Sequence, residues 1–196
     1  MKAIPNVYDT RQYLDQVKEM LDCIEGQINA FVEALYQAYL QDNLIFLIGN
    51  GGSAANASHF GQDLNKGTLA HMATVKRFRA ISLTDNTSFI TALANDEGYE
   101  SIFVEQLMNL SGPTDVLIAI SGSGNSRNVL KAVEYATNHG MTTIGVSGFD
   151  GGVLRNMAGV NIHVPSHDMG LVEAVHGVIF HLAISQLKQR VEQSAA

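Results

Sequence analysis

Apolar positions in the first part of the chain recur every three or four residues. Within residues 8–41 they are Tyr13, Val17, Met20, Leu21, Ile24, Ile28, Phe31, Val32 and Leu35. This spacing predicts one or two long helices with a continuous apolar face. Such a face must be buried against another surface.

The pattern changes from Asn43 onward, where short apolar runs alternate with helical spacing. Strands are predicted over residues 44–48, 79–83, 115–120, 141–147 and 160–164, and helices over 53–66, 86–95, 99–110, 126–139 and about 170–192. Fully apolar runs such as 44–48 are typical of parallel strands that are covered on both faces. The alternation predicts an α/β fold with a doubly wound sheet of about five parallel strands.

The length of 196 residues fits a single domain, with no repeat or linker. Within it, we expect residues 1–42 to form N-terminal helices and residues 43–196 to form the α/β core. The net charge of −7 and the absence of a basic block disfavour an extended nucleic-acid surface. Cys23 is the only cysteine, which fits a reducing compartment. We find neither a signal peptide nor an apolar stretch long enough to cross a bilayer, and we expect a cytoplasmic protein without membrane partners.

Two loops rich in glycine and serine follow predicted strands. "GNGGS" covers 49–53 after the first strand, and "SGSGNS" covers 121–126 after the third. Ligands of such sheets bind outside the carboxyl ends of the strands, and a helix start favours an anion. We therefore expect Ser121, Ser123 and Ser126 to hold a phosphate. Tight turns with serine N-caps are the simpler alternative. Neither loop is a P-loop or an in-register G-x-G-x-x-G motif.

Several motifs together resemble the sugar isomerase (SIS) domain proteins, most closely the phosphoheptose isomerase group. They are "GNGGSAANASHF", "LTDN", "ALANDEGYE", "ISGSGNSRNV", "GFDGG" and "EAVHGVIFH". The resemblance implies a flavodoxin-like sheet and a homotetramer with active sites between subunits, in which residues 1–42 serve in oligomerisation. It also implies isomerisation of sedoheptulose 7-phosphate to D-glycero-D-manno-heptose 7-phosphate, a step toward heptose nucleotides for surface polysaccharide such as lipopolysaccharide.

The resemblance also assigns chemical roles to individual residues. It implies one zinc ion per subunit, bound by His59, Asp63, Glu173 and His181, which are ligand types that zinc accepts. Asp63 and His181 would be the catalytic acid/base pair. The implied substrate contacts are Asn50, Gly51, Gly52, Ser53, Asp96, Ser121, Gly122, Ser123, Asn125, Ser126 and Glu173.

The chain departs from the family pattern at two of these positions. The family usually has a longer Glu where this chain has Asp63, and a Gln where it has Glu173. Lys66 is the nearest counterpart of a basic residue that the family uses for phosphate. These differences are compatible with a divergent isomerase subgroup or with a different phosphosugar.

Simpler interpretations remain open for the individual residues. His59 and Asp63 lie four residues apart and would form an ordinary intrahelical pair. His181 could be a hydrogen-bonded core histidine, with His176 substituting for it as a ligand. For the whole chain, the alternatives are a non-catalytic SIS tetramer that binds a replication initiator protein and a phosphosugar sensor.

Overall fold

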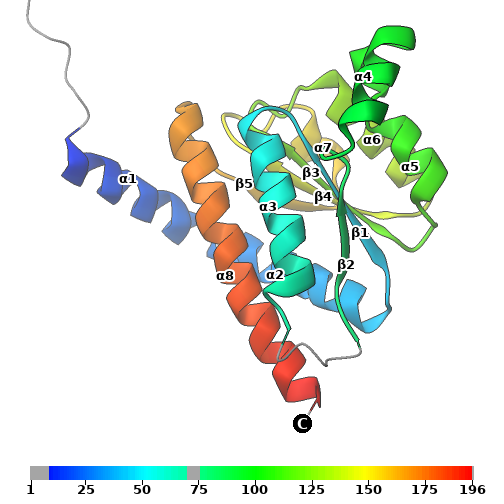
Figure 1. Cartoon of the computed structure of the whole chain (residues 1–196). Helices are drawn as coiled ribbons and strands as arrows, with labels where there is room; N and C mark the ends of the chain where they lie inside the picture. The colour runs from blue at the N-terminus through cyan, green and yellow to red at the C-terminus, as the bar shows by residue number, and fades with distance from the viewer. Residues whose placement is uncertain (1–8, 70–75, 196) are drawn as a thin grey trace, which may run out of the picture.

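The computed structural model describes residues 9–69 and 76–195, and its centre is a parallel sheet (Figure 1). The strands are β1 (Leu44–Gly49), β2 (Arg79–Ser82), β3 (Val116–Ser121), β4 (Thr142–Ser147) and β5 (Val160–His163). They are ordered β2-β1-β3-β4-β5, and every neighbouring pair is parallel. The predicted doubly wound α/β fold with five parallel strands is confirmed.

The helices also follow the sequence pattern closely. They are α1 (Thr10–Cys23), α2 (Glu25–Leu40), α3 (Gly52–Lys66), α4 (Thr87–Asp96), α5 (Val104–Leu110), α6 (Arg127–Asn138), α7 (Leu154–Met157) and α8 (Met169–Ala195), with a 3₁₀ turn at Tyr99–Ser101. The helix predicted from residue 99 starts later in the structure, because Tyr99–Ser101 form the 3₁₀ turn and α5 begins only at Val104. The sequence analysis missed α7 because four residues are too few to show a period.

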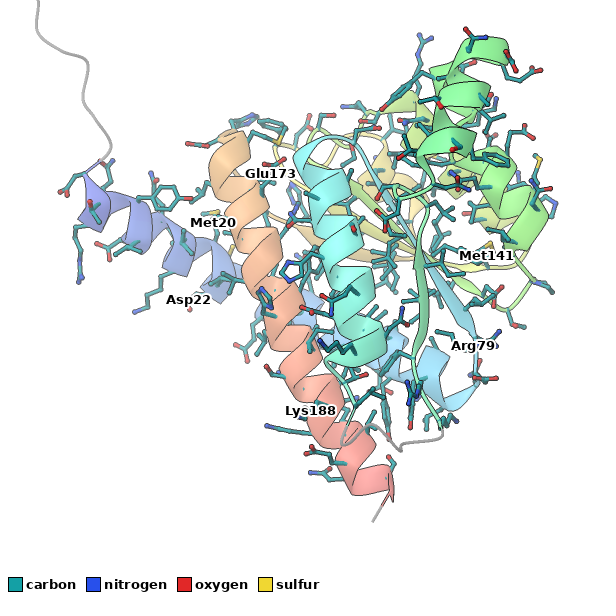
Figure 2. All side chains as sticks on the ribbon, viewed as in Figure 1. Met20, Asp22, Arg79, Met141, Glu173 and Lys188 are labelled. Atoms are coloured by element: carbon teal, nitrogen blue, oxygen red, sulfur yellow. The ribbon has the colours of Figure 1, made fainter. Side chains whose placement is uncertain are left out.

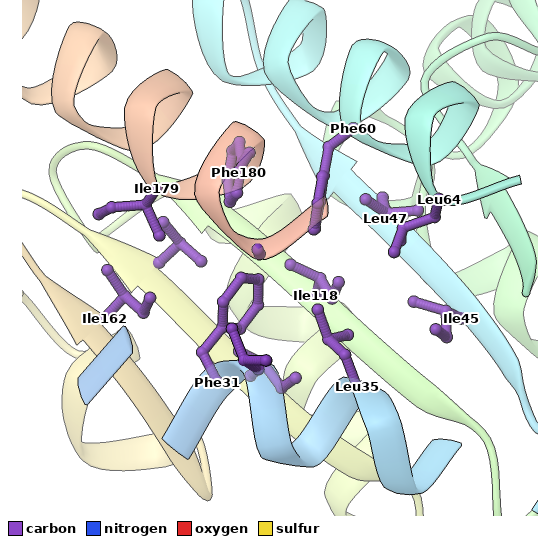
Figure 3. Close-up of a cluster of buried hydrophobic side chains, with 14 of the residues drawn as sticks. Phe31, Leu35, Ile45, Leu47, Phe60, Leu64, Ile118, Ile162, Ile179 and Phe180 are labelled. Carbon is purple, nitrogen blue, oxygen red and sulfur yellow. The ribbon is translucent and has the colours of Figure 1, made fainter. Parts of the chain in front are cut away.

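Alternate residues of β1 enter two separate cores, which explains why this strand is apolar throughout. Ile45 and Leu47 pack with α2, α3 and α8 on one face. Phe46 and Ile48 pack with α5, α6 and α7 on the other. Figure 3 shows the first of these cores, where the rings of Phe60 and Phe180 stack with centroids 4.5 Å apart. This stack fixes α3 against α8, the two helices that carry the predicted catalytic residues.

Helix α1 differs from α2 in how it meets the rest of the chain. None of the α1 side chains is buried, and Leu14 is 55% exposed. In Figure 1 this helix extends away from the body of the molecule. Helix α2 instead buries residues such as Phe31 and Leu35 against the sheet. Of these two N-terminal helices, α1 therefore leaves more of its apolar side chains exposed on the single chain.

Helix α8 corrects one expectation from the sequence. Residues Met169–Ser194 are long and apolar enough to cross a membrane by length and composition, with a mean hydropathy of 1.4. The statement that no stretch reaches this length was wrong. In the fold, α8 buries a stripe formed by Val172, Val175, Ile179, Ala183 and Leu187 in the core. Such a stripe is what a core helix of a globular domain requires, so the length alone is weak evidence of a membrane span.

The side chain of Asn65 joins α3 to the edge of the sheet. Its Nδ2 donates to the Ala80 carbonyl at 2.8 Å, and its Oδ1 accepts from the Ala80 N–H at 2.8 Å. Because β2 is an edge strand, these bonds satisfy backbone groups that have no strand partner. They also anchor the C-terminal half of α3, where Asp63 lies.

Candidate active site

The sheet order brings the two glycine-serine loops together. β1 and β3 are adjacent, and Gly49 pairs with Ile120 in the register of the two strands. After β1 the chain continues to β2 on one side of β1, and then crosses to β3 on the other side of β1. This is the topological switch point, where open α/β sheets bind their ligands.

A cavity of about 200 Å³ lies at this point. Its lining comprises Asn50, Ser53, Ile120, Ser121, Gly122, Ser123, Ser126, Met169 and Glu173. Seven of these residues were predicted substrate contacts, and the structure brings them together from both loops and from α8. The cavity lies where the sequence analysis expects a phosphate, and we call it the phosphate cavity after that expectation.

The starts of α3 and α6 support anion binding here. Ser126 is the N-cap of α6, but its side chain makes no capping bond to the helix. Instead, the Ser121 hydroxyl donates to Ser126 Oγ at 3.2 Å. At α3 the N-cap is Gly51, which has no side chain to offer. In α6 it is the Asn128 side chain, not the N-cap serine, that accepts from a first-turn N–H, that of Val129. The simple interpretation of serine N-caps is therefore disfavoured, and the dipole of each helix start still favours an anion.

Two glycines allow α8 to approach these loops closely. A Cβ on Gly52 would collide with the Glu173 carboxylate, and one on Gly122 would lie 2.5 Å from Met169 Sδ. Gly51 adopts a φ of +56°, which favours glycine. Gly51 and Gly52 were predicted substrate contacts, but they are not among the residues that line the cavity.

Two other predicted contacts also lie outside the cavity. Asn125 supports the serine loop, because its Nδ2 donates to the Ser123 carbonyl at 2.9 Å and its Oδ1 accepts from the Val153 N–H at 3.2 Å. Asp96 ends α4 in an exposed position, where its Oδ1 accepts a hydrogen bond from Asn95. The single chain therefore does not bring Asp96 to the phosphate position.

The second part of the site is a cluster of His59, Asp63 and His181. Asp63 Oδ2 lies 3.4 Å from His59 Nε2 and 3.6 Å from His181 Nδ1. The two imidazole rings meet edge to face at 5.0 Å. One donor atom from each residue lies within 4.8 Å of the others. The histidine side chains are 56% and 63% exposed, so the cluster is open to solvent on a single chain.

This donor set fits a zinc ion. Two imidazoles and one carboxylate are a known combination for catalytic zinc, which keeps a further position open for water or substrate. The helical spacing of His59 and Asp63 puts them on one face of α3, and the packing of α8 adds His181. The interpretation of His59 and Asp63 as an isolated intrahelical pair is therefore incomplete, since His181 completes the group.

Glu173 does not lie in this cluster. It precedes His181 by eight residues on α8, which separates them by about 12 Å along the helix axis. In Figure 2 it lies near the start of α8, on the side of the neighbouring helix α3. Its carboxylate faces Gly52 and lines the phosphate cavity. The structure thus brings three of the four predicted zinc ligands together and places Glu173 apart from them.

His176 is excluded as a substitute ligand. It is fully buried, and its Nε2 donates to the Ser147 carbonyl at the end of β4 at 3.2 Å. Burial lowers the pKa of His176 from 6.5 to about 4, although this hydrogen bond acts in the opposite direction. His176 is the core histidine of α8, whereas His181 is the exposed one. Lys66 also lies elsewhere, in a cavity between α3 and β2 that includes Arg77 and Asp85.

A model of the SIS domain matches residues 12–148. The chain belongs to the SIS domain family. A curated relative named phosphoheptose isomerase, from Helicobacter pylori (strain P12), is 38% identical over 168 residues, which cover 86% of each chain.

Solved structures of SIS proteins agree with the relationship. Phosphoheptose isomerase GmhA from Neisseria gonorrhoeae has a TM-score of 0.84 at 30% identity, covering 91% of this chain and 94% of that one. A phosphoheptose isomerase from Francisella tularensis has a TM-score of 0.85 at 28% identity, with the same coverage. Both similarities cover about nine-tenths of this chain.

The sequence analysis of this SIS domain missed Asn128 and Tyr99, which contact Asn50 beside the phosphate cavity. Asn128 carried a signal that could have revealed it. Helix α6 buries Asn128 together with Val129, Ala132, Val133 and Ala136, so a polar residue occupies an otherwise apolar face. Buried polar side chains need hydrogen-bond partners, and its partner is Asn50.

Proposed function

We propose that this protein is a phosphoheptose isomerase that converts sedoheptulose 7-phosphate to D-glycero-D-manno-heptose 7-phosphate. The observation that carries the proposal is that one pair of helices bears both parts of the site. The starts of α3 and α8 contribute Ser53 and Glu173 to the phosphate cavity. About two to three turns later, the same helices contribute Asp63 and His181 to the histidine cluster.

The spacing of the two parts suits a seven-carbon substrate. Glu173 and His181 are separated by about 12 Å along α8. An extended heptose 7-phosphate spans about 10 Å from phosphorus to C1, judged from bond lengths near 1.5 Å. A phosphate in the cavity would therefore allow C1 and C2 to approach Asp63 and His181. A shorter sugar phosphate in the same cavity would fall short of the cluster.

The serine loops bind and orient the phosphate in this proposal. Hydroxyls of Ser121, Ser123 and Ser126 donate hydrogen bonds, and the first N–H groups of α6 face the negative charge. Among the residues that the structure describes, no Lys or Arg side chain lines this cavity, so helix-start dipoles and hydroxyls provide the attraction. Orientation by these groups holds the reacting carbons near the cluster.

The reaction moves one proton between C1 and C2 through an enediol. In our proposal, Asp63 or His181 takes the proton from C1 of the ketose, and the other member of the pair moves a proton between the C1 and C2 oxygens. Return of the proton to C2 then gives the aldose. A zinc ion held by His59, Asp63 and His181 would polarise the sugar oxygens.

We further propose a homotetramer with active sites between subunits, located in the cytoplasm. Helix α1 leaves Leu14 exposed, and the histidine cluster is open on a single chain. A neighbouring subunit that covers both would also explain why Asp96 lies outside the cavity of its own chain. The relatives reported above are named as isomerases, which gives no support to the alternative of an initiator-binding module.

Incubation with sedoheptulose 7-phosphate tests the proposal. Formation of the aldose is followed by NMR on purified protein supplied with zinc, and fructose 6-phosphate serves as the shorter control. We expect turnover of the heptose and little or none of the hexose. Absence of aldose from the heptose, in protein that binds zinc, would refute the assignment.

A further inference from the structure

Three polar side chains connect the two ligand loops beside the phosphate cavity. Asn50 Nδ2 donates to Asn128 Oδ1 at 2.9 Å, and Asn128 Nδ2 donates back to Asn50 Oδ1 at 2.8 Å. The hydroxyl of Tyr99 donates to the same Asn50 Oδ1 at 2.9 Å. Asn50 and Asn128 are 78 residues apart in the chain, so these bonds join segments that only the fold brings together.

The hydrogen-bonding capacity of the two amides is almost fully used. Asn128 Oδ1 also accepts from the backbone N–H of Val129 at 3.0 Å. A backbone N–H can only donate, so the atom facing it must be the amide oxygen. This contact fixes which way the Asn128 amide faces, and the reciprocal pair then fixes Asn50. Asn50 Oδ1 accepts two bonds, and Nδ2 keeps one free hydrogen. Asn50 can therefore offer a ligand a single N–H, in one direction.

The pair also sets the relative position of two helix starts. The Asn50 carbonyl accepts from the N–H groups of Ser53 and Ala54 in the first turn of α3. Asn128 lies in the first turn of α6. Both helix starts face the phosphate cavity, so a shift of either amide would move its N–H groups relative to the ligand. Orientation of this kind affects how a substrate is held for reaction.

Tyr99 approaches the pair from a neighbouring cavity. This second cavity has a volume of about 540 Å³, and its lining includes Tyr99, Asn128 and Ser126. Asn50 and Ser126 line both cavities, so the amide pair lies where the two meet. Tyr99 is 56% exposed, so it is not part of either hydrophobic core.

We propose that Asn128 and Tyr99 are positioning residues for the phosphate-bearing end of the substrate. They hold Asn50 so that the loop after β1 stays aligned with the serine loop after β3. Neither residue needs to touch the reacting carbons. This inference rests on the proposed function, since it assumes that a sugar phosphate occupies the smaller cavity.

The test compares Asn128→Asp with a matched control, Gln106→Glu. Both positions are 3% exposed, and both substitutions convert a buried amide to a carboxyl group. Gln106 Nε2 donates to the carbonyls of Leu83 and Ile102, away from both cavities. The control therefore reports the cost of a buried carboxyl group without disturbing the Asn50 contact. Tyr99→Phe is the third variant, because losing one exposed hydroxyl leaves the fold intact.

The measurements are KM and kcat for sedoheptulose 7-phosphate, its dissociation constant by calorimetry, and the melting temperature. We expect Asn128→Asp to raise the dissociation constant and KM by about tenfold or more, because two oxygens would then face each other at the Asn50 contact. Tyr99→Phe should raise both by about threefold at an unchanged melting temperature. Gln106→Glu should lower the melting temperature and leave KM unchanged.

Each outcome decides the assignment. Unchanged affinity in folded Asn128→Asp would overturn it, as would equal losses of affinity in Asn128→Asp and Gln106→Glu. If Asn128→Asp does not fold, Tyr99→Phe decides alone, and an unchanged KM in that variant refutes the role. If the unmodified protein does not bind sedoheptulose 7-phosphate, the proposed function fails and this inference fails with it. Binding that all variants retain overturns the inference alone.

Discussion

The buried histidine of α8 predicts how the stability of this domain depends on pH. His176 is fully buried, and burial lowers its pKa from 6.5 to about 4. Between these two values the unfolded chain binds a proton at this residue and the folded chain does not. Stability therefore is at its full value above pH 6.5, and it falls as the pH is lowered toward 4.

The magnitude follows from the two pKa values. Each pKa unit corresponds to about 1.4 kcal/mol, so the full loss from His176 approaches about 3 kcal/mol when the pH falls below 4. At pH 5 the loss relative to pH 7.5 is already about 2 kcal/mol. This is a considerable part of the stability of an ordinary domain, which lies at about 5–15 kcal/mol.

The variant His176→Leu isolates this contribution. Replacing the imidazole does not leave the Ser147 carbonyl without a partner, because that oxygen also accepts from the Val164 N–H at 2.9 Å. The assay is urea denaturation followed by circular dichroism at pH 7.5 and pH 5, at one fixed protein concentration. We expect the free energy of unfolding of the unmodified protein to fall between the two pH values by about 2 kcal/mol more than that of the variant. Equal falls in the two proteins would show that His176 is not protonated on unfolding, and the reasoning would be refuted.

The remaining predictions concern binding, catalysis and assembly. Ser123→Ala should raise KM by about fivefold to tenfold at a nearly unchanged melting temperature, because it removes one hydroxyl donor from a loop; a lower melting temperature with unchanged KM would make the loop merely structural. Asp63→Asn and His181→Ala should abolish turnover while sedoheptulose 7-phosphate still binds by calorimetry, and full activity in both would remove them from the mechanism. Glu173→Gln should keep most activity, because it restores the residue usual in the family, and metal analysis should show unchanged zinc content if Glu173 belongs to the phosphate cavity. Light scattering at micromolar concentration should give the mass of a tetramer, whereas a monomeric mass would contradict the proposed assembly.

Local spacing in the sequence was enough to predict the five strands, the longer helices and part of the candidate site. The strand at Leu44–Gly49 is apolar throughout because both of its faces are buried, which the run of apolar residues already indicated. His59 and Asp63 share a helix face because four residues make about one turn. The glycine-serine loops were placed correctly because strand ends in a parallel sheet lie at one edge. In each case the prediction depends on the geometry of a single strand, helix turn or loop, which extends over only a few residues.

Tertiary packing decided which residues from distant segments of the chain lie next to one another. The sequence could not distinguish His176 from His181 as the exposed histidine, because the orientation of α8 depends on its contacts with α2, α3 and the sheet. Glu173 and His181 lie on similar sides of α8, because eight residues are close to two helical turns. Their separation along the helix axis nevertheless places them in two different parts of the site. The amide pair of Asn50 and Asn128 depends on the adjacency of β1 and β3. Spacing along a helix fixes the direction of a side chain, whereas the neighbour it meets is fixed only when the helices and strands pack together.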